Sequence, residues 1–332
     1  MSQKWIVIGS NSFSGATFVQ QLLEQGEDVI SISRSAENPT ALLPYRWVSS
    51  DKLTRHQFHA LDLNQNTTEI LSVIGDFHPN YVVNFAAQSM VAESWLYPDQ
   101  WYQTNVVANV RLHEGLRKFD FIEKYVHVTT PEVYGSCSGI VTEEHAFNPS
   151  TPYAASRAAC DLHLMTFFKQ YKFPVCFTRA ANVFGPGQPL YRIIPRCIYF
   201  FKIGRRLQLH GGGHSVRSFI HMKDVAEGTM KIAHQAPAGE CYHFSTDLYL
   251  PIRDVVKMIA EQMNVSFEEG VEIVGDRPGK DAAYLLDSSK ARKTLDWYPA
   301  ITLEQGITEV IAWVNRFENE LGEIPKDYLH KP

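Results

Sequence analysis

The feature that most constrains the fold is a glycine-bounded turn that directly follows an apolar run near the N-terminus. Trp5-Ile6-Val7-Ile8 reads as a buried strand, and the turn Gly9-Ser10-Asn11-Ser12-Phe13-Ser14-Gly15 leads into a helical pattern over residues 16–25. A strand, a tight turn and a helix in this order hold a pyrophosphate on backbone N–H groups and the helix N-terminus. The spacing is G-x-x-S-x-x-G, and an ordinary capped turn is the alternative. Its place after the first strand favours a dinucleotide site.

Short apolar runs continue to alternate with helical patterns through the N-terminal half. Strands are expected at 29–32, 58–63, 81–85, 125–128 and 175–178, and helices at 68–77, 98–119 and 152–171. Nearly continuous apolar strands separated by helices are typical of a parallel sheet covered on both faces. The sequence therefore predicts an α/β fold with a doubly wound parallel sheet, the Rossmann arrangement.

The pattern loosens after Gly185-Pro186-Gly187 and indicates a smaller α+β unit. Helices are expected near 193–203, 251–262 and 303–320, with a strand at 216–222 and a loosely held tail from Ile324. A chain of 332 residues exceeds the size at which one core keeps growing. We predict a dinucleotide-binding domain from 1–181 plus about 215–247, and a substrate domain from about 182–214 plus 248–332.

Composition and charge exclude several classes of partner. The net charge of −5 argues against nucleic acid and anionic membranes, which both require a basic surface. Five scattered cysteines without a C-x-x-C pair argue against disulfides and zinc, and the 13 histidines show no metal-ligand spacing, so no metal is expected. His127, His210 and His214 read as structural. No run is long enough to span a membrane and the first strand begins by Lys4, so we expect a cytoplasmic protein.

The end of the second expected strand bears on the choice of dinucleotide. NAD sites place an acid there for the ribose hydroxyls, whereas this chain has Ser33-Arg34-Ser35. A guanidinium between hydroxyls suits a 2′-phosphate, so NADP is predicted, with NAD as the alternative. The same residues also form solvated turns. Asp62, after the third strand, either reaches the adenine or caps the next helix.

A second group of residues has the composition of an oxidation site. Thr130 and Glu132 follow the strand at 125–128, and Tyr153 and Arg157 share a helix face at spacing i, i+4. A nearby cation favours the phenolate of a tyrosine, which can then take a proton from a carbinol while hydride leaves. A surface Tyr–Arg pair is the alternative. The carboxyl edge of a doubly wound sheet is where ligands bind, which favours the catalytic interpretation.

These residues belong to a larger set of motifs, which covers nearly the full length. The others are Asn84-Phe85-Ala86-Ala87-Gln88-Ser89, Arg179-Ala180-Ala181-Asn182-Val183-Phe184-Gly185-Pro186, Arg217-Ser218-Phe219-Ile220-His221 and Asp276-Arg277-Pro278-Gly279. With them the chain resembles the extended short-chain dehydrogenase/reductases, specifically the nucleotide-sugar 4,6-dehydratases of the dTDP-glucose and GDP-mannose type. The Ala-Ala-Gln-Ser run and the turn at Arg34 are closest to the GDP-mannose branch.

The resemblance implies a three-stage reaction on an NDP-hexose. Tyr153 and Thr130 oxidise C4, Glu132 removes the C5 proton as water leaves C6, and the stored hydride returns to C6. The product is a 4-keto-6-deoxy sugar, and the tightly bound cofactor is regenerated in each cycle. Glu132 is the discriminating residue, because epimerases of the superfamily usually have a small or apolar residue at that position.

The resemblance also assigns ligand-binding residues. Cofactor contacts are expected at Gly9, Asn11, Ser12, Phe13, Gly15, Ser33, Arg34, Ser35, Asp62, Leu63, Ala86, Tyr153 and Arg157. Substrate contacts are expected at Gln88, Ser89, Glu93, Asn182, Arg217 and Arg277. Asn182 and the two arginines are placed at the pyrophosphate. A homodimer through the helices near 98–119 and 152–171 is typical of such proteins and leaves an apolar outer stripe on them.

Two positions depart from the family pattern. At the position of Pro131, the dTDP-glucose enzymes have an Asp that protonates the departing hydroxyl, and the GDP-mannose branch has a Ser. At the position of Arg157, the family pattern has a Lys. Proline cannot donate a proton, so either Glu132 serves as base and then acid or a water relay through Thr130 replaces the missing acid. Arg157 keeps the charge but makes different hydrogen bonds. An epimerase, a 5,6-dehydratase and a non-catalytic nucleotide-binding protein remain the alternatives.

Overall fold

The computed structural model describes residues 2–137, 139–275 and 285–331. Its centre is a seven-stranded sheet in the order β3-β2-β1-β4-β5-β7-β11, in which every neighbouring pair is parallel. The strands are β1 (Lys4–Ile8), β2 (Asp28–Ser33), β3 (His56–Ala60), β4 (Tyr81–Asn84), β5 (Lys124–Val128), β7 (Val175–Ala180) and β11 (Cys241–Phe244). The predicted doubly wound α/β fold is confirmed.

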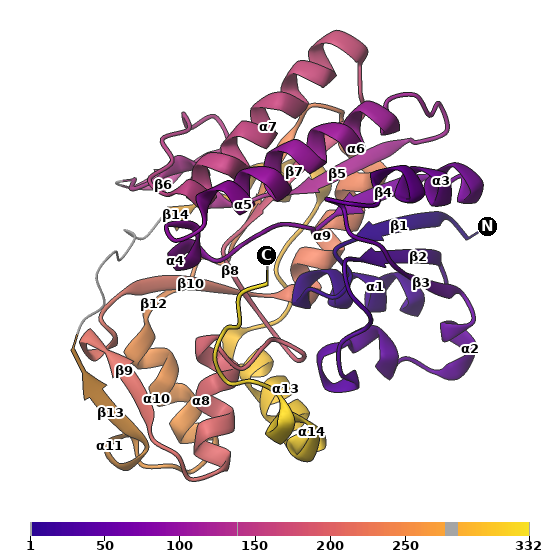
Figure 1. Ribbon diagram of the computed structural model, residues 1–332. Coiled ribbons are helices and arrows are strands. Elements are labelled where there is room, and N and C mark those ends of the chain that lie inside the picture. The colour runs from indigo at the N-terminus through magenta and orange to yellow at the C-terminus, as the bar shows by residue number, and fades with distance from the viewer. Residues whose placement is uncertain (1, 138, 276–284, 332) are drawn as a thin grey trace.

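Helices cover both faces of this sheet (Figure 1). Side chains alternate between the faces, so Trp5 and Val7 pack on one side and Ile6 and Ile8 on the other. The first side is covered by α1 (Phe13–Glu24), α9 (Met222–Gln235) and α12 (Ser289–Leu295). The second is covered by α3 (Thr67–Phe77), α6 (Asn109–Leu116) and α7 (Pro152–Tyr171). Burial on both faces explains why these strands read as unbroken apolar runs.

A second hydrophobic core lies below the sheet in the view of Figure 1. It is built by α8 (Ile193–Lys202), α10 (Ile252–Gln262) and α13 (Leu303–Arg316), beside α11 (Phe267–Gly270) and α14 (Glu318–Glu323). Two small sheets, β12-β10-β8 and β13-β9, contribute to it, whereas a third, β14-β6, packs beside α7 in a separate small cluster. Their strands are β6 (Ile140–Val141), β8 (Asn182–Phe184), β9 (Leu207–His210), β10 (Val216–His221), β12 (Tyr249–Pro251), β13 (Val271–Val274) and β14 (Leu285–Leu286). The exact domain boundaries stay a prediction.

Several element boundaries differ from the sequence-based expectation. β3 begins and ends earlier than the predicted 58–63, because an edge strand does not need an apolar run to pair with β2. The helix predicted at 98–119 consists of α5 (Pro98–Tyr102), a π-helical segment (Gln103–Ala108) and α6. Short helices α2 (Ser50–Leu53) and α4 (Val91–Ser94) precede it in the chain.

The expectation of a loosely held tail is also wrong. After α14 the chain runs back toward the carboxyl edge of the central sheet, visible as the yellow trace that ends at the C label of Figure 1. Lys331 there accepts hydrogen bonds from Arg34 and Gln88, and His330 stacks on aromatic rings. A short polar segment gave no apolar pattern from which such docking was predictable.

Buried histidines give the fold a predicted sensitivity to acid. Burial lowers the pKa of His243 to about 3, and it holds the pKa of His127 and His113 well below the ordinary value. The unfolded chain therefore binds more protons below about pH 6.5, and stability is lost as the pH falls from there toward the folded-state values. Each buried histidine is expected to cost on the order of 1–2 kcal/mol at pH 5. Urea unfolding at pH 7 and pH 5 measures this, and an equal or higher free energy of unfolding at pH 5 would contradict it.

Candidate active site

The turn after β1 has the geometry that its glycines predict. Gly9 adopts a φ of +86°, and a Cβ there would lie 2.6 Å from the backbone nitrogen of Ala86. A Cβ on Gly15 would lie 2.4 Å from the Gly9 carbonyl oxygen, so the start of α1 packs directly on the turn. Ser12 caps α1, because its Oγ accepts from the Gly15 N–H at 3.1 Å and donates to the Gly9 carbonyl at 2.7 Å. Ser12 thus stabilises the turn itself, and the open backbone beside it fits a pyrophosphate.

Asn11 joins this turn to the end of β2. Its backbone N–H donates to Ser33 Oγ at 3.0 Å, and its side-chain Nδ2 donates to the carbonyl of Ser35 at 3.1 Å. Arg34 lies between those two serines, and both of its terminal nitrogens donate to the Lys331 carbonyl at 3.2 Å. The sequence did not reveal that this predicted phosphate-binding arginine also contacts the end of the chain.

A cleft follows the carboxyl edge of the sheet in two adjoining parts. The loop part, of about 240 Å³, is lined by Gly9, Asn11, Ser12, Ser33, Arg34, Ser35, Asp62, Leu63, Ala86 and Gln88, among others. The wide part, of about 800 Å³, is lined by Asn11, Ser12, Phe13, Arg34, Ser89, Thr130, Glu132, Asn182 and Arg217, among others. Most residues assigned to the cofactor and to the substrate from sequence therefore meet in one cleft.

Asp62 lies just beyond β3 and has a local role as well as a place in the loop part. Its Oδ1 accepts from the backbone N–H of Asn64 at 2.8 Å, which closes a turn. Asn66, and not Asp62, occupies the N-cap position of α3. Of the two alternatives left open by the sequence, helix capping is therefore excluded.

Thr130, Glu132 and Tyr153 meet at the end of β5. Thr130 is the N-cap of a 3-10 turn (Pro131–Tyr134), and its Oγ1 accepts from the Glu132 N–H at 3.2 Å. The hydroxyl of the same threonine lies close enough to the phenol of Tyr153, which is buried in α7, to lower the pKa of that phenol. Pro131 fits the first position of the turn because no N–H is needed there. The arrangement brings a hydroxyl, a carboxylate and a phenol together beside the wide part.

The environment of Tyr153 does not favour the phenolate on balance. Burial raises the pKa of the phenol above its ordinary value, and the Glu132 carboxylate raises it further. The Arg157 guanidinium, the Thr130 hydrogen bond and the Arg192 guanidinium lower it. Arg157 therefore lowers the pKa of Tyr153, as predicted, but in the free protein burial raises this pKa by more.

Arg157 is held beneath the cleft by β5. Its Nη2 donates to the Val128 carbonyl and to His127 Nε2, the latter at 3.3 Å, and only 2% of the residue is exposed. Within the described residues its Nε and Nη1 have no hydrogen-bond partner. A neutral imidazole accepts from a cation without competing for charge, so His127 holds this arginine in place. Sequence reasoning classed His127 as structural and missed this contact.

His127 also belongs to a buried group that has the composition of a metal site. The ligand atoms of His113, His127 and Cys160 lie within 4.8 Å of one another. However, His113 Nε2 is bonded to the Tyr125 hydroxyl at 2.9 Å, and the Arg157 guanidinium lies against His127. A fixed positive charge at this distance opposes a metal cation. We therefore describe the group as part of a polar network under the active site, and the expectation of no metal stays a prediction.

The residues predicted to bind the substrate do not all lie in the same part of the structure. Asn182, Arg217 and Ser89 line the wide part, and Gln88 lines the loop part. Glu93 lines neither part, and Arg277 lies outside the described residues. Arg192, which the sequence analysis did not select, lines the wide part near Tyr153. It follows a loop without any motif, so no signal in the sequence distinguished it from a surface arginine.

Asn105 is a second residue that the sequence analysis missed. It lies in the π-helical segment and is fully buried. Its Oδ1 accepts from the backbone N–H of Gln88 at 2.8 Å, and its Nδ2 donates to the Gln88 carbonyl at 3.0 Å. The same Nδ2 also donates to Ser156 Oγ at 2.9 Å. The π turn re-aims this amide toward the end of β4. Asn105 therefore fixes the strand end that carries Gln88 against the helix that carries Tyr153.

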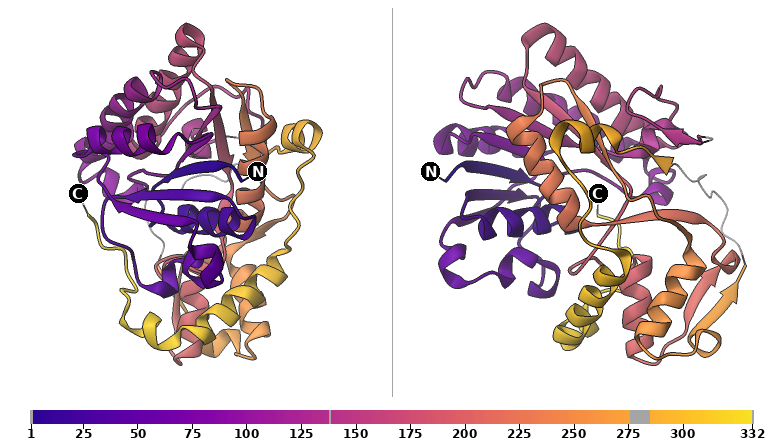
Figure 2. Two further views of the ribbon diagram at one scale, coloured as in Figure 1. Left: turned by 90° about the vertical axis from the view of Figure 1, so that its right-hand side faces the viewer. Right: turned by 180° about the vertical axis from the view of Figure 1, so that it is seen from behind.

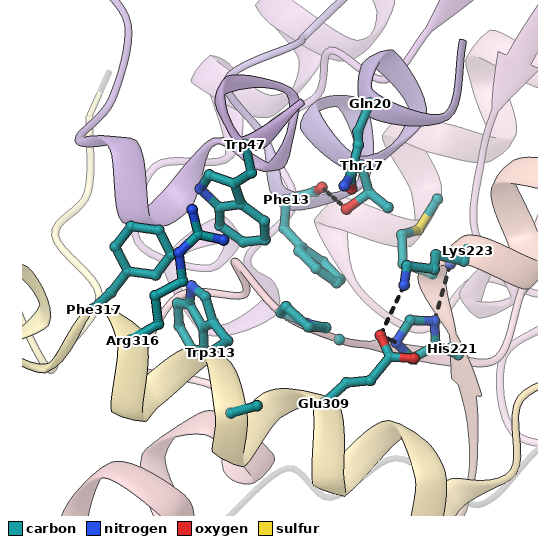
Figure 3. Close-up of a pocket in the computed structure, with 14 residues that line it drawn as sticks. Phe13, Thr17, Gln20, Trp47, His221, Lys223, Glu309, Trp313, Arg316 and Phe317 are labelled. Atoms are coloured by element: carbon teal, nitrogen blue, oxygen red, sulfur yellow. Dashed lines mark hydrogen bonds and ion pairs between the residues drawn. The ribbon is translucent and has the colours of Figure 1, made fainter. Parts of the chain in front are cut away.

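A separate cavity of about 270 Å³ is also lined by Phe13 (Figure 3). The carboxylate of Glu309 in α13 forms an ion pair with Lys223 Nζ at 2.9 Å and lies 3.7 Å from His221 Nε2. Among the sequence-predicted site residues, Phe13 alone lines it. This cavity separates α1 from α13 and is distinct from the cleft that holds the candidate catalytic groups.

The parallel sheet, the glycine turn and the Thr130–Tyr153 pair together define an extended short-chain dehydrogenase/reductase. Residues 6–310 match the family model described as GDP-mannose 4,6 dehydratase. The chain belongs to this family of nucleotide-sugar 4,6-dehydratases.

Relatives and solved structures agree with this assignment. The dTDP-glucose 4,6-dehydratase of Xanthomonas campestris pv. campestris is 30% identical, with 93% of this chain and 92% of that one aligned. The structure of dTDP-glucose 4,6-dehydratase from Streptomyces venezuelae, with NAD bound, has a TM-score of 0.86 at 29% identity and covers 96% of this chain and 99% of that one. UDP-glucose 4-epimerase from Thermotoga maritima has a TM-score of 0.84 at 21% identity, covers 95% of this chain and 100% of that one, and shows the fold alone.

No helix within the described ranges combines the length and the apolar character that crossing a membrane requires.

Proposed function

We propose that this protein converts an NDP-hexose to its 4-keto-6-deoxy form by oxidation at C4, elimination of water across C5 and C6, and return of the hydride to C6. The observation that carries the proposal is that Thr130 and Glu132 line the wide part together, with the phenol of Tyr153 close to both of them. Oxidation alone needs the threonine and the tyrosine. A carboxylate at this place is needed only when the C5 proton must also be removed.

The residues of the site have separate roles in this reaction. Tyr153 removes the C4 hydroxyl proton, with Thr130 holding the same oxygen. Glu132 takes the C5 proton, which the neighbouring ketone acidifies. The nicotinamide, when bound, accepts the hydride at C4 and returns it at C6. Arg192, Arg217 and Asn182 hold the pyrophosphate of the substrate.

The missing acid at Pro131 points to a second role for Glu132. The carboxylates that line the wide part within the described residues are Glu132 and Asp327, and Asp327 is paired with Arg196 at 2.5 Å. Glu132 can hold the proton taken from C5 and give it to the hydroxyl leaving C6, which departs as water. When the hydride then reaches C6, C5 takes its new proton from solvent. We therefore infer that Glu132 acts first as base and then as acid.

For the cofactor we propose NADP, with NAD as the alternative. Ser33, Arg34 and Ser35 line the loop part and suit a 2′-phosphate. The related enzymes from Streptomyces venezuelae and Bacillus anthracis were solved with NAD, which supports a nicotinamide dinucleotide but not the choice of NADP. Mass spectrometry of the dinucleotide released from the purified protein decides between the two.

We also propose a cytoplasmic homodimer. Tyr102, Val107 and Leu162 are 41%, 38% and 58% exposed on the outer sides of the helical regions 98–116 and 152–171, where an apolar stripe was expected. Light scattering that gave the mass of one chain would contradict the dimer.

Incubation in D₂O with NADP or NAD and a panel of NDP-hexoses tests the activity. We expect a 4-keto-6-deoxy product that carries deuterium at C5, read by NMR. Retention of the 6-hydroxyl with an inverted centre would instead identify an epimerase, and a 5,6-unsaturated product a 5,6-dehydratase. The absence of turnover on every sugar would leave a nucleotide-binding protein.

A further inference from the structure

The C-terminal segment Ile324–Lys331, which we call the strap, crosses the mouth of the cleft. It leaves α14 in the second domain and ends beside β2 and β4 of the first (Figures 1 and 2). Pro325, Asp327, Tyr328 and Leu329 line the wide part, and Lys331 lines both parts. The strap therefore lines the wide part with most of its residues and reaches the loop part through Lys331.

Specific contacts fasten the strap at both ends. Near its start, Arg196 binds the Lys326 carbonyl and the Asp327 carboxylate. Near its end, His330 stacks on Tyr97 with centroids 5.2 Å apart and on Trp101 at 5.3 Å. The imidazole Nε2 of His330 also lies 2.6 Å from Gln100 Oε1. A ring held by two aromatic faces and a hydrogen bond has a defined position.

The backbone of the strap forms hydrogen bonds with Arg34 and Gln88, two side chains that were assigned to different ligands. The Lys331 carbonyl accepts from both terminal nitrogens of Arg34 at 3.2 Å and from Gln88 Nε2 at 2.8 Å. Arg34 was assigned to the dinucleotide and Gln88 to the sugar. The strap therefore ends where the cofactor and substrate regions adjoin.

The strap covers the cleft without filling it. Cavities of about 240 and 800 Å³ remain beneath and beside it. Leu329 is 64% exposed and Lys331 is exposed, so their outer sides face solvent. A segment that occupied the ligand's place would be enclosed by the walls of the cleft and would leave little free volume.

We propose that the strap closes over the bound dinucleotide and retains it between catalytic cycles. The inference rests on the proposed function, in which the hydride removed at C4 must return at C6 and the same dinucleotide must stay bound. Loss of the strap removes the contacts of Lys331 with Arg34 and Gln88 and opens the mouth of the cleft. Since covering contacts act mainly on dissociation, the release rate is the quantity that changes.

The test measures release of dinucleotide from the purified holoenzyme, without any sugar. The protein is loaded with NADP or NAD, diluted, and the freed dinucleotide is followed over time. A chain that stops after Leu329 and the variant His330→Ala are both expected to release it about tenfold faster or more. His330→Phe keeps the stacking, and its release rate is expected to lie between the rates of these two variants and the rate of the unmodified protein. Tyr298→Ala removes an exposed aromatic ring outside the strap and is the matched control.

The outcomes separate this inference from the proposed function. Release at the unmodified rate from both strap variants would overturn the strap proposal while leaving the dehydratase activity untouched. Slower release would show that the segment obstructs the site, and would also overturn it. A protein that binds neither dinucleotide would overturn the proposed function, and the strap proposal with it. Unchanged thermal midpoints of His330→Ala and Tyr298→Ala exclude a general loss of folding as the cause of faster release.

Discussion

Tyr153→Phe is expected to lower turnover by about 10³-fold, which corresponds to about 4 kcal/mol of activation free energy. The substitution removes one oxygen from a buried ring and leaves its packing in α7 in place. Because Tyr153 is the proposed proton acceptor beside Thr130, we expect no neighbouring residue to replace it. Oxidation at C4 is the first step, so the loss appears both in product formation and in the formation of reduced cofactor during a single turnover.

The control for this variant is Tyr298→Phe, which removes the hydroxyl of an exposed tyrosine outside the cleft and is expected to leave turnover unchanged. If Tyr153→Phe kept more than about a tenth of the turnover, a different group would have to be the base for the C4 hydroxyl.

Glu132→Gln is expected to separate oxidation from elimination. The amide keeps the size of the side chain but cannot take the C5 proton, while Thr130 and Tyr153 keep their contact. We expect a fall in dehydration of about 10²–10⁴-fold, with C4 oxidation retained. Absorbance of reduced nicotinamide should therefore build up on the enzyme when the sugar is added, and little 6-deoxy product should form.

A substrate with a better leaving group at C6 tests the double role of Glu132. The matched control Glu144→Gln changes an exposed carboxylate that does not line the cleft, and normal turnover is expected from it. In Glu132→Gln, replacement of the C6 hydroxyl by a better leaving group is expected to recover little activity, because the base is missing as well. A large recovery would show that Glu132 is only the acid and that another group removes the C5 proton.

Much of this site could be predicted because its parts follow the ends of strands. Gly9 and Arg34 come directly after β1 and β2, Thr130 is the second residue after β5, and the carboxyl ends of parallel strands share one edge. The prediction therefore needed only the order of strands and helices. The same reasoning failed for Asn105 and Arg192, whose importance depends on a π turn and on a loop fold that leave no periodic pattern.

The sign of the Tyr153 pKa shift shows a different limit of sequence reasoning. A cation at i+4 predicts a lowered pKa, and Arg157 does lower it. Burial and Glu132 raise it by more, and neither magnitude is encoded in the spacing of residues. The contact of His127 with Arg157 is equally invisible, because β5 and α7 meet only in the folded chain.

By itself the sequence determined the parallel sheet, the glycine turn at which a pyrophosphate is predicted, and the candidate set Thr130, Glu132, Tyr153 and Arg157. These depend on local chemistry and on periods of two and 3.6 residues, which are present in the chain before it folds. Only the tertiary structure decided that Glu132 stands beside Tyr153 and that Arg157 is held by His127. Only it brought Lys331 onto Arg34, because contacts between residues 297 positions apart depend on how both domains pack.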